Sequence, residues 1–132
     1  MMLSPRTKSA ILFVFVFIIT MKTYQFFRDT SQRDRLLKFG YLGNCRITEI
    51  NSSGSKYKNT VCYIYFVNNK SYNDSKQYVI SGALESRLLD VTIPILYDKT
   101  NPKINHLLLF KSDFQSYNMN YPDSLKWIEE LR

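Results

Sequence analysis

The stretch TVCYIYFVNNKSY, residues 60–72, decides the fold of this 132-residue chain. Its first eight residues are rich in β-branched and aromatic side chains, which favour a β-strand. Asn68 and Asn69 follow, and asparagine tolerates the positive φ angles that a tight hairpin turn requires. The stretch therefore predicts one strand that turns sharply into the next.

The segment before this strand supplies its expected partner. Residues 45–50, CRITEI, alternate in polarity, and the loop NSSGSK separates them from the strand. A hairpin centred on Ser53-Gly54 places Cys45 opposite Cys62, Ile47 opposite Thr60 and Glu49 opposite Lys58. This register predicts a core face made of Cys45, Ile47, Cys62, Ile64 and Phe66. The opposite face then carries Arg46, Thr48, Tyr63 and Tyr65.

The two cysteines allow two interpretations. Directly opposed Cα atoms lie about 4.5 Å apart, which is within disulfide range, and a bridge between Cys45 and Cys62 would stabilise the fold by about 3 kcal/mol. In a reducing compartment both are small buried hydrophobic side chains instead. We expect no metal and no cofactor, because two cysteines and the distant His106 do not form a ligand set.

Downstream of the hairpin the elements are shorter. Residues 73–76, NDSK, are polar, and QYVI, residues 77–80, predicts a short third strand whose core face stays open. SGALESRLLD, residues 81–90, predicts a turn or two of helix with Leu84, Leu88 and Leu89 facing inward.

TIPILYDKTNP, residues 92–102, predicts a strand that stops at a polar turn. Pro94 cannot donate to a ladder, so we expect it at a sheet edge, among the first residues of the strand or at a bulge. The Asp98 carboxylate is expected to accept backbone N–H groups of the next residues, and Asn-Pro favours a turn. Polar residues thus have local roles in a structural turn made of Tyr97, Asp98, Asn101 and Pro102. INHLLLF, residues 104–110, predicts a further strand.

The N-terminal segment AILFVFVFIITM, residues 10–21, predicts a transmembrane helix. Its apolar run consists of Ala10, Ile11, Leu12, Phe13, Val14, Phe15, Val16, Phe17, Ile18 and Ile19. The nineteen residues from 9 to 27 rise about 28 Å as a helix, close to the thickness of a hydrocarbon core. A cleaved signal peptide is the main competing interpretation, although TMKTYQFF offers no small-x-small cleavage site. A buried helix of a soluble protein is the third.

Most of the net positive charge lies in and near this N-terminal segment. The net charge is +7, of which residues 1–40 contribute seven basic minus two acidic side chains, or +5, and residues 41–132 contribute eleven minus nine, or +2. RDTSQRDRLLKFG, residues 28–40, predicts a helical stalk that ends at Gly40, or a basic patch that contacts anionic lipid. The positive-inside rule favours a cytoplasmic domain, whereas the signal-like N-terminus favours the opposite side, so the orientation stays open.

The C-terminal segment YPDSLKWIEEL, residues 121–131, predicts a short helix capped by Asp123 or Ser124. Leu125, Ile128 and Leu131 form a stripe that is expected to pack on the sheet, since so short a helix is marginal alone. Docking to a protein partner is the second possible use of this helix.

Two motifs carry a family resemblance. YIYFVNNKSY, residues 63–72, and PILYDKTNP, residues 94–102, resemble a widespread family of small bacterial membrane-associated β-domain proteins of undefined function. Lys99 stands where that family usually has proline, and the turn before Lys70 lacks the usual glycine. Residues 110–132 are also similar to the ends of uncharacterised envelope-type proteins of Bacteroidetes-like bacteria. The resemblance implies a fold and membrane association but no catalytic residue.

These observations predict a mostly β protein: a small antiparallel sheet or barrel, residues 41–132, behind an anchor and basic juxtamembrane helix, residues 1–40, with α+β as the second fold class. No catalytic constellation is recognised, so we expect a non-enzymatic, single-pass membrane protein of the bacterial envelope that binds lipid and has a binding or structural role.

Three further function classes are weighed against this expectation. An enzyme would have to use Asp98 or His106. An immunity-type protein would neutralise a toxin by binding it. A nucleic-acid-binding module would use Tyr63, Tyr65 and Arg46 as its platform. The near-neutral charge of residues 41–132 argues against nucleic acid.

Overall fold

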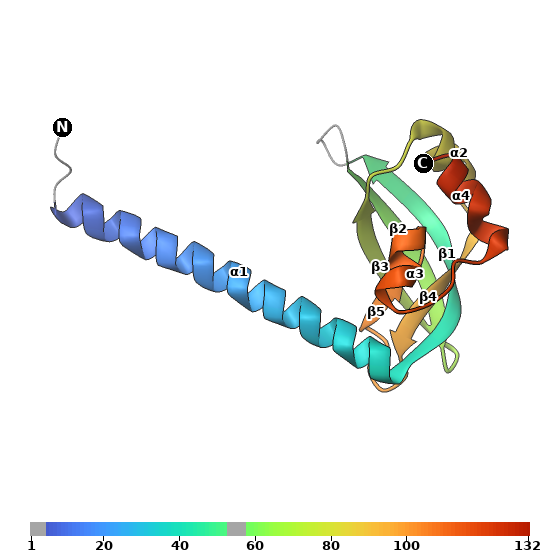
Figure 1. Cartoon of the computed structure of the whole chain (residues 1–132), viewed down its shortest axis with the longest axis horizontal. Coiled ribbons are helices and arrows are strands. Elements are labelled where there is room, and N and C mark those ends of the chain that lie inside the picture. The colour runs from blue at the N-terminus through green and yellow to red at the C-terminus, as the bar shows by residue number, and fades with distance from the viewer. Residues whose placement is uncertain (1–4, 53–57) are drawn as a thin grey trace. The chain divides into compact units, whose positions relative to one another are not determined.

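The computed structural model describes residues 5–52 and 58–132 (Figure 1). The chain forms two compact units, one that ends at Arg35 and one that runs from Leu36 to Arg132. The elements, in chain order, are α1 (Pro5–Phe39), β1 (Gly40–Ser52), β2 (Asn59–Val67), β3 (Lys70–Tyr78), α2 (Gly82–Leu88), β4 (Thr92–Asp98), β5 (Asn105–Leu107), α3 (Lys111–Ser116), the 3-10 turn η1 (Asp123–Leu125) and α4 (Lys126–Glu130).

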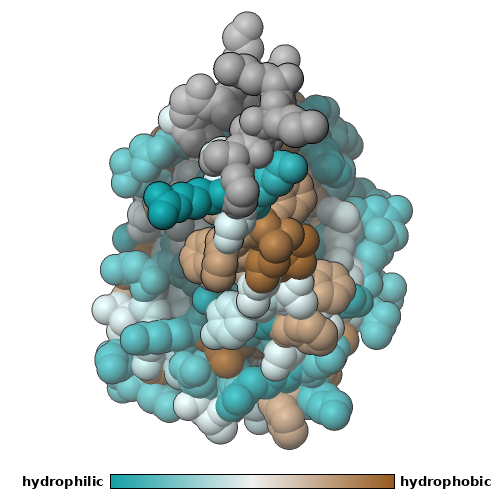
Figure 2. Space-filling model, turned by 90° about the vertical axis from the view of Figure 1, so that its left-hand side faces the viewer, coloured by the Kyte–Doolittle hydropathy of each residue, from teal (hydrophilic) through white to brown (hydrophobic). Residues whose placement is uncertain are grey.

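The apolar part of α1 is uncovered. From Ile11 to Ile19 the side chains are exposed, Phe13 to 76%, and brown apolar side chains stand at the surface in Figure 2. Just after the run, the hydroxyls of Thr20 and Thr23 donate to the carbonyls of Val16, at 2.6 Å, and Ile19, so these polar groups are satisfied by the helix itself. By length and composition α1 is able to cross a membrane.

Gly40 marks the passage from α1 to β1. A Cβ atom at this position would lie 2.3 Å from the Leu36 carbonyl oxygen and 2.9 Å from Cγ of Leu96. The predicted stop at Gly40 is therefore confirmed, but for a steric reason, since no glycine among the described residues has a positive φ. Of the three large apolar residues just before it, Leu36, Leu37 and Phe39, only Leu36 is buried.

The five strands form one antiparallel sheet in the order β3-β2-β1-β4-β5. Strand β4 lies beside β1, next to the β1-β2-β3 meander, which is the Greek-key arrangement. The sheet curls on itself (Figure 1), and the result is a partly open, five-stranded half-barrel in Greek-key order. The prediction of a small antiparallel β-domain between an N-terminal helix and a short C-terminal helix is confirmed.

The predicted register of the first hairpin is wrong. Cys45 pairs with Tyr65, Ile47 pairs with Tyr63, and a bulge after Ile47 brings Glu49 opposite Cys62. The core face of β2 accordingly consists of Val61, Tyr63, Tyr65 and Val67, while Phe66 on the other face is exposed. The error arose because β2 carries apolar side chains on both faces, so alternation did not define the buried one. The turn expected at Ser53-Gly54 lies outside the described residues.

The second hairpin turn is confirmed. Asn68 and Asn69 have φ angles of 52° and 64°, which suits a type I′ turn, and Val67 pairs with Lys70 across it. The expected third strand at residues 77–80 is wrong in extent, because β3 begins at Lys70, runs through the polar NDSK segment and ends at Tyr78. The sequence pattern missed it because β3 is an edge strand in which only Tyr78 is buried.

The remaining elements complete the domain. In α2, Leu84 and Leu88 are buried as expected, but Leu89 is exposed. Pro94 lies near the start of β4, before the pairing with β5 begins at Ile95. INHLLLF forms only the three-residue β5, after which Leu108, Leu109 and Phe110 enter the core outside a strand.

The C-terminal helix packs within the domain. Leu125 and Ile128 of its stripe are buried, and the Ser81 hydroxyl, at the N-terminus of α2, donates to the Leu131 carbonyl. The expected side-chain cap by Asp123 or Ser124 is not formed at η1 or α4. The Arg87 guanidinium of α2 lies 5.3 Å from the Trp127 ring centre, in agreement with α2 and α4 lying at the same end in Figure 1. The stripe is thus used inside the domain.

Candidate functional site at the barrel seam

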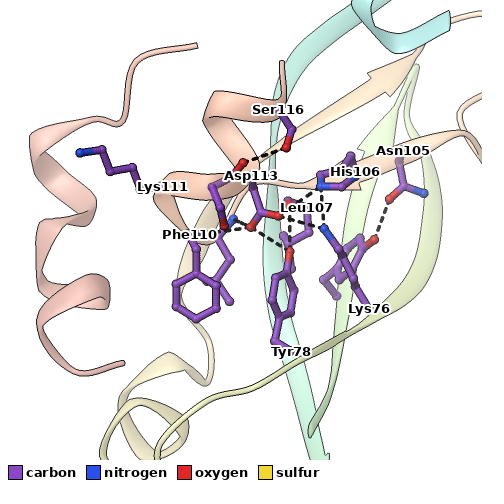
Figure 3. Close-up of polar contacts among 12 residues, drawn as sticks. Lys76, Tyr78, Asn105, His106, Leu107, Phe110, Lys111, Asp113 and Ser116 are labelled. Atoms are coloured by element: carbon purple, nitrogen blue, oxygen red, sulfur yellow. Dashed lines mark hydrogen bonds and ion pairs between the residues drawn. The ribbon is translucent and has the colours of Figure 1, made fainter. Parts of the chain in front are cut away.

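The two end strands of the sheet, β3 and β5, face each other across a seam. All neighbouring strands are antiparallel, so with five strands β3 and β5 run in the same direction. Side chains bridge the seam in place of a backbone ladder (Figure 3): Lys76 Nζ on β3 lies 2.6 Å from His106 Nε2 on β5. Beside this contact, Asn105 Nδ2 donates to Asp74 Oδ2 at 2.6 Å, and the Tyr63 hydroxyl donates to Asn105 Oδ1 at 2.6 Å.

Asp113 of α3 closes one end of the seam. Its Oδ1 lies 3.0 Å from Lys76 Nζ and 3.2 Å from His106 Nε2. Its Oδ2 accepts from the Tyr78 hydroxyl at 3.2 Å and from the backbone N–H groups of Leu109, at 3.1 Å, and Phe110, at 2.9 Å. One buried carboxylate therefore ties together β3, β5 and the first turn of α3 (Figure 3).

The charges of this cluster follow from its surroundings. Burial raises the pKa of Asp113, but the hydrogen bond from His106, the charge of Lys76 and the Phe110 N–H together outweigh it and lower the pKa to about 2. Burial lowers the pKa of Lys76, and Asp113 offsets part of that effect. Burial, reinforced by Asp113, raises the pKa of Tyr78 well above its usual value. Asp113 is thus a carboxylate at neutral pH, and Tyr78 is a hydroxyl donor.

The polar side chains of the cluster have hydrogen-bond partners within the domain. The Tyr78 hydroxyl donates to the Leu107 carbonyl as well, at 2.9 Å, and the His106 ring meets Tyr117 edge to face at 4.9 Å. Within residues 5–52 and 58–132, no buried side-chain nitrogen or oxygen lacks a hydrogen-bond partner. The cluster therefore acts as a clamp, with its polar atoms turned toward one another.

On the Lys70 side of Asp74, an open groove of about 500 Å³ lies between β3 and the segment that carries Lys103. Its inner wall is aromatic, because the Tyr72 ring stacks on the Tyr65 ring with centres 5.6 Å apart. The groove is lined by Tyr65, Lys70, Ser71, Tyr72, Asn73, Asp74 and Lys103.

The turn between β4 and β5 forms the other side of this groove. The buried Asp98 carboxylate accepts from Thr100 N at 2.8 Å, from Thr100 Oγ1 at 2.7 Å and from Asn101 N at 3.4 Å. The Tyr65 hydroxyl donates to the Pro102 carbonyl at 2.5 Å. The turn of Tyr97, Asp98, Asn101 and Pro102 thus fixes the segment that carries Lys103.

The structure separates several residues that sequence reasoning brought together. Cys45 and Cys62 are free thiols on opposite faces of the sheet. They are not directly opposed, as the predicted register required, so the geometric basis of the predicted disulfide is removed. Tyr63 and Tyr65 are buried, 3% and 2% exposed, so their rings are not available for the stacking platform that was weighed as an alternative. His106, named as a possible enzymatic residue, contacts Lys76 and Asp113.

Sequence reasoning missed Lys76, Tyr78 and Asp113. The contacts of Lys76 and Tyr78 with His106, Leu107 and Asp113 span 29 to 37 residues of chain. A single sequence carries no signal for such pairs. Within the described chain, no group of three or more His, Cys, Asp or Glu side chains is placed to hold a metal ion.

Comparison with known proteins adds no identity. The chain matches no family model, no curated protein and no solved structure. The resemblance to the membrane-associated β-domain family therefore stays a prediction.

Proposed function

We propose that this protein is a non-enzymatic, single-pass membrane-anchored binding protein of the bacterial envelope. The uncovered apolar run of α1 is the observation that carries the proposal. Water-soluble monomers rarely expose a contiguous apolar surface of this kind. The nine residues Ile11–Ile19 favour a bilayer by about 3 to 5 kcal/mol on an insertion scale.

The binding role rests on the open groove. The clamp around Asp113 is internally satisfied, whereas the groove at Lys70 and Lys103 presents exposed charged side chains beside an aromatic wall. A domain tethered at the membrane with one open edge suits contact with a partner better than chemistry on a small substrate.

Flotation of membranes in a density gradient tests the anchor. We expect the wild-type chain to float and Phe15→Arg/Val16→Arg to leave the membrane fraction, because charged side chains at the centre of a span are costly. Thr30→Arg/Ser31→Arg adds the same charge outside the apolar run and should float. A wild-type chain that fails to float, or whose mass shows cleavage beyond Phe27, would contradict the anchor.

Site-specific photo-crosslinking in cells tests the binding role. A photoreactive residue at Ser71, beside the groove, should give a defined protein adduct, and the same residue at the exposed Ser86 of α2 should not. Equal adducts from both positions, or none from either, would refute a binding role for the groove.

A further inference from the structure

We propose that the edge of β3 at Ser71–Asn73 binds an extended, acidic peptide segment of a partner protein by strand addition. The inference rests on the proposed binding function and names the class of partner. In this mode main-chain hydrogen bonds supply affinity, and side chains along the groove supply specificity.

The main chain of β3 is arranged for this. β3 is the last strand on its side of the sheet, so within the described residues no strand pairs with its outer edge. Lys70 pairs with Val67 directly across a two-residue turn. Alternation then directs the main-chain groups of Lys70 and Tyr72 toward β2, and those of Ser71 and Asn73 outward.

The open length is limited by the seam. From Asp74 onward the outer edge is covered by the contacts of Asp74 with Asn105 and of Lys76 with His106. Four steps from Lys70 to Asp74 span about 13 Å of strand, which accommodates about four extended residues. The groove lies along this same stretch, so a strand added there enters an existing hollow.

Charge selects the occupant. Lys70 and Lys103 are exposed on the groove, whereas its one carboxylate, on Asp74, accepts from Asn105 Nδ2 and from Ser75 N. A peptide with acidic side chains complements these cations. A second copy of the chain would bring its own Lys70 to the same edge, and like charges facing each other across strands are unfavourable.

The test uses the full-length protein in non-ionic detergent and a fluorescein-labelled octapeptide of alternating glutamate and valine. We expect saturable binding by fluorescence anisotropy, with slowed hydrogen exchange at the amides of Ser71 and Asn73. N-methylation of alternate peptide residues should weaken binding at least about tenfold in one of the two registers, because it removes two or more main-chain bonds. Methylation in the other register should have a smaller effect.

Charge variants provide the second arm. Lys70→Glu and Lys103→Glu should each weaken binding about threefold to tenfold, since an exposed attraction becomes a repulsion. Lys111→Glu, an exposed lysine that does not line the groove, is the matched control and should bind as wild type. Fluorescence of Trp127 checks that each variant is folded.

Several results would overturn the inference: no binding of the peptide by wild type, equal binding of both N-methylated registers and the parent, or tighter binding of a lysine–valine peptide. Salt-sensitive binding of an oligothymidylate of twelve nucleotides would indicate that the edge binds single-stranded nucleic acid instead. Dimerisation abolished by Asn73→Pro would indicate that it binds a second copy of the chain. A wild-type chain that binds the peptide but does not float would refute the anchor alone. A wild-type chain that floats but does not bind the peptide would refute the strand-addition inference and leave the membrane anchor standing.

Discussion

Lys76 Nζ lies 3.0 Å from Asp113 Oδ1, and this ion pair joins the edge strand β3 to helix α3. The two residues are 37 positions apart in the chain. The same carboxylate also accepts the N–H groups of Leu109 and Phe110, so the contact across the seam and the start of α3 depend on one side chain.

Replacing Asp113 should therefore be costly. Asp113→Ala leaves the N–H groups of Leu109 and Phe110 without this acceptor and removes the ion pair of Lys76 and one of the two acceptors of the Tyr78 hydroxyl, which should lower the free energy of unfolding by about 3 kcal/mol. Thermal melting followed by the fluorescence of Trp127, the only tryptophan, measures this. Asp123→Ala, which removes an exposed pair with Lys126, is the control and should melt like wild type. Equal melting of the two variants would contradict the clamp.

The same carboxylate predicts an acid-sensitive stability. The pKa of Asp113 is about 2 in the folded state against 3.8 ordinarily, so its stabilisation is complete above about pH 4 and is lost as the pH falls toward 2. The difference amounts to about 2 kcal/mol. Denaturant unfolding between pH 2 and 6 should show this loss in wild type and a flatter profile in Asp113→Asn. Parallel profiles would show that other carboxylates govern the acid response.

Gly40 should resist substitution. In Gly40→Ala the new Cβ meets the Leu36 carbonyl oxygen at 2.3 Å, and the required shift should cost about 1 to 3 kcal/mol. Gly82→Ala, at the first position of α2, meets no atom within 4 Å and should be neutral or slightly stabilising. Melting curves of the two variants provide the comparison. If Gly40→Ala melts like wild type, the backbone between α1 and β1 adjusts to the new Cβ atom without cost.

Asp98 should control the turn beside the groove. Asp98→Ala leaves Thr100 N, Thr100 Oγ1 and Asn101 N without their acceptor and should destabilise the domain by about 1 to 3 kcal/mol. Thr100→Ala removes the hydroxyl bond to Asp98 but keeps both backbone bonds to this carboxylate, and should cost about 1 kcal/mol or less. Unfolding in urea ranks the two, and a larger effect of Thr100→Ala would contradict the assigned role of the carboxylate.

The cysteines should behave as separate thiols. Burial raises the pKa of Cys45 to about 12, and burial together with Glu49 raises that of Cys62, so neither is a ready nucleophile near neutral pH. In the folded protein a maleimide should modify the half-buried Cys62 slowly and Cys45 only after denaturation. Peptide mass mapping locates the label. An intramolecular Cys45–Cys62 crosslink on a non-reducing gel would contradict the observed register.

The sequence predicted those parts of the fold that depend on local chemistry. The Asn68-Asn69 turn, the stop at Gly40 and the uncovered helix each follow from residues within a few positions of one another. The register of β1 and β2 did not, because a bulge after Ile47 shifts the pairing and both faces of β2 are apolar. Bulges are set by the demands of barrel curvature, which no local pattern in this segment reveals.

The seam was beyond a single sequence for a related reason. Lys76 and Asp74 belong to a strand whose polar residues look like a loop, and their partners on β5 and α3 are defined only once the sheet has curled. His106 was noticed only as an isolated histidine. Its role depends on Lys76 and Asp113, which lie 30 residues before it and 7 after it.

The odd number of strands has a consequence for how the barrel comes apart. Four strand pairs are held by main-chain ladders, but in the described part of the chain the line between β3 and β5 is held by side chains. We expect thermal opening to begin along that line, before the strand pairs that are held by main-chain ladders separate. A molecule caught in this state presents Tyr63, Tyr65 and Tyr78 to water, so proteolytic nicking and aggregation should both start at the seam, well before the hairpins separate.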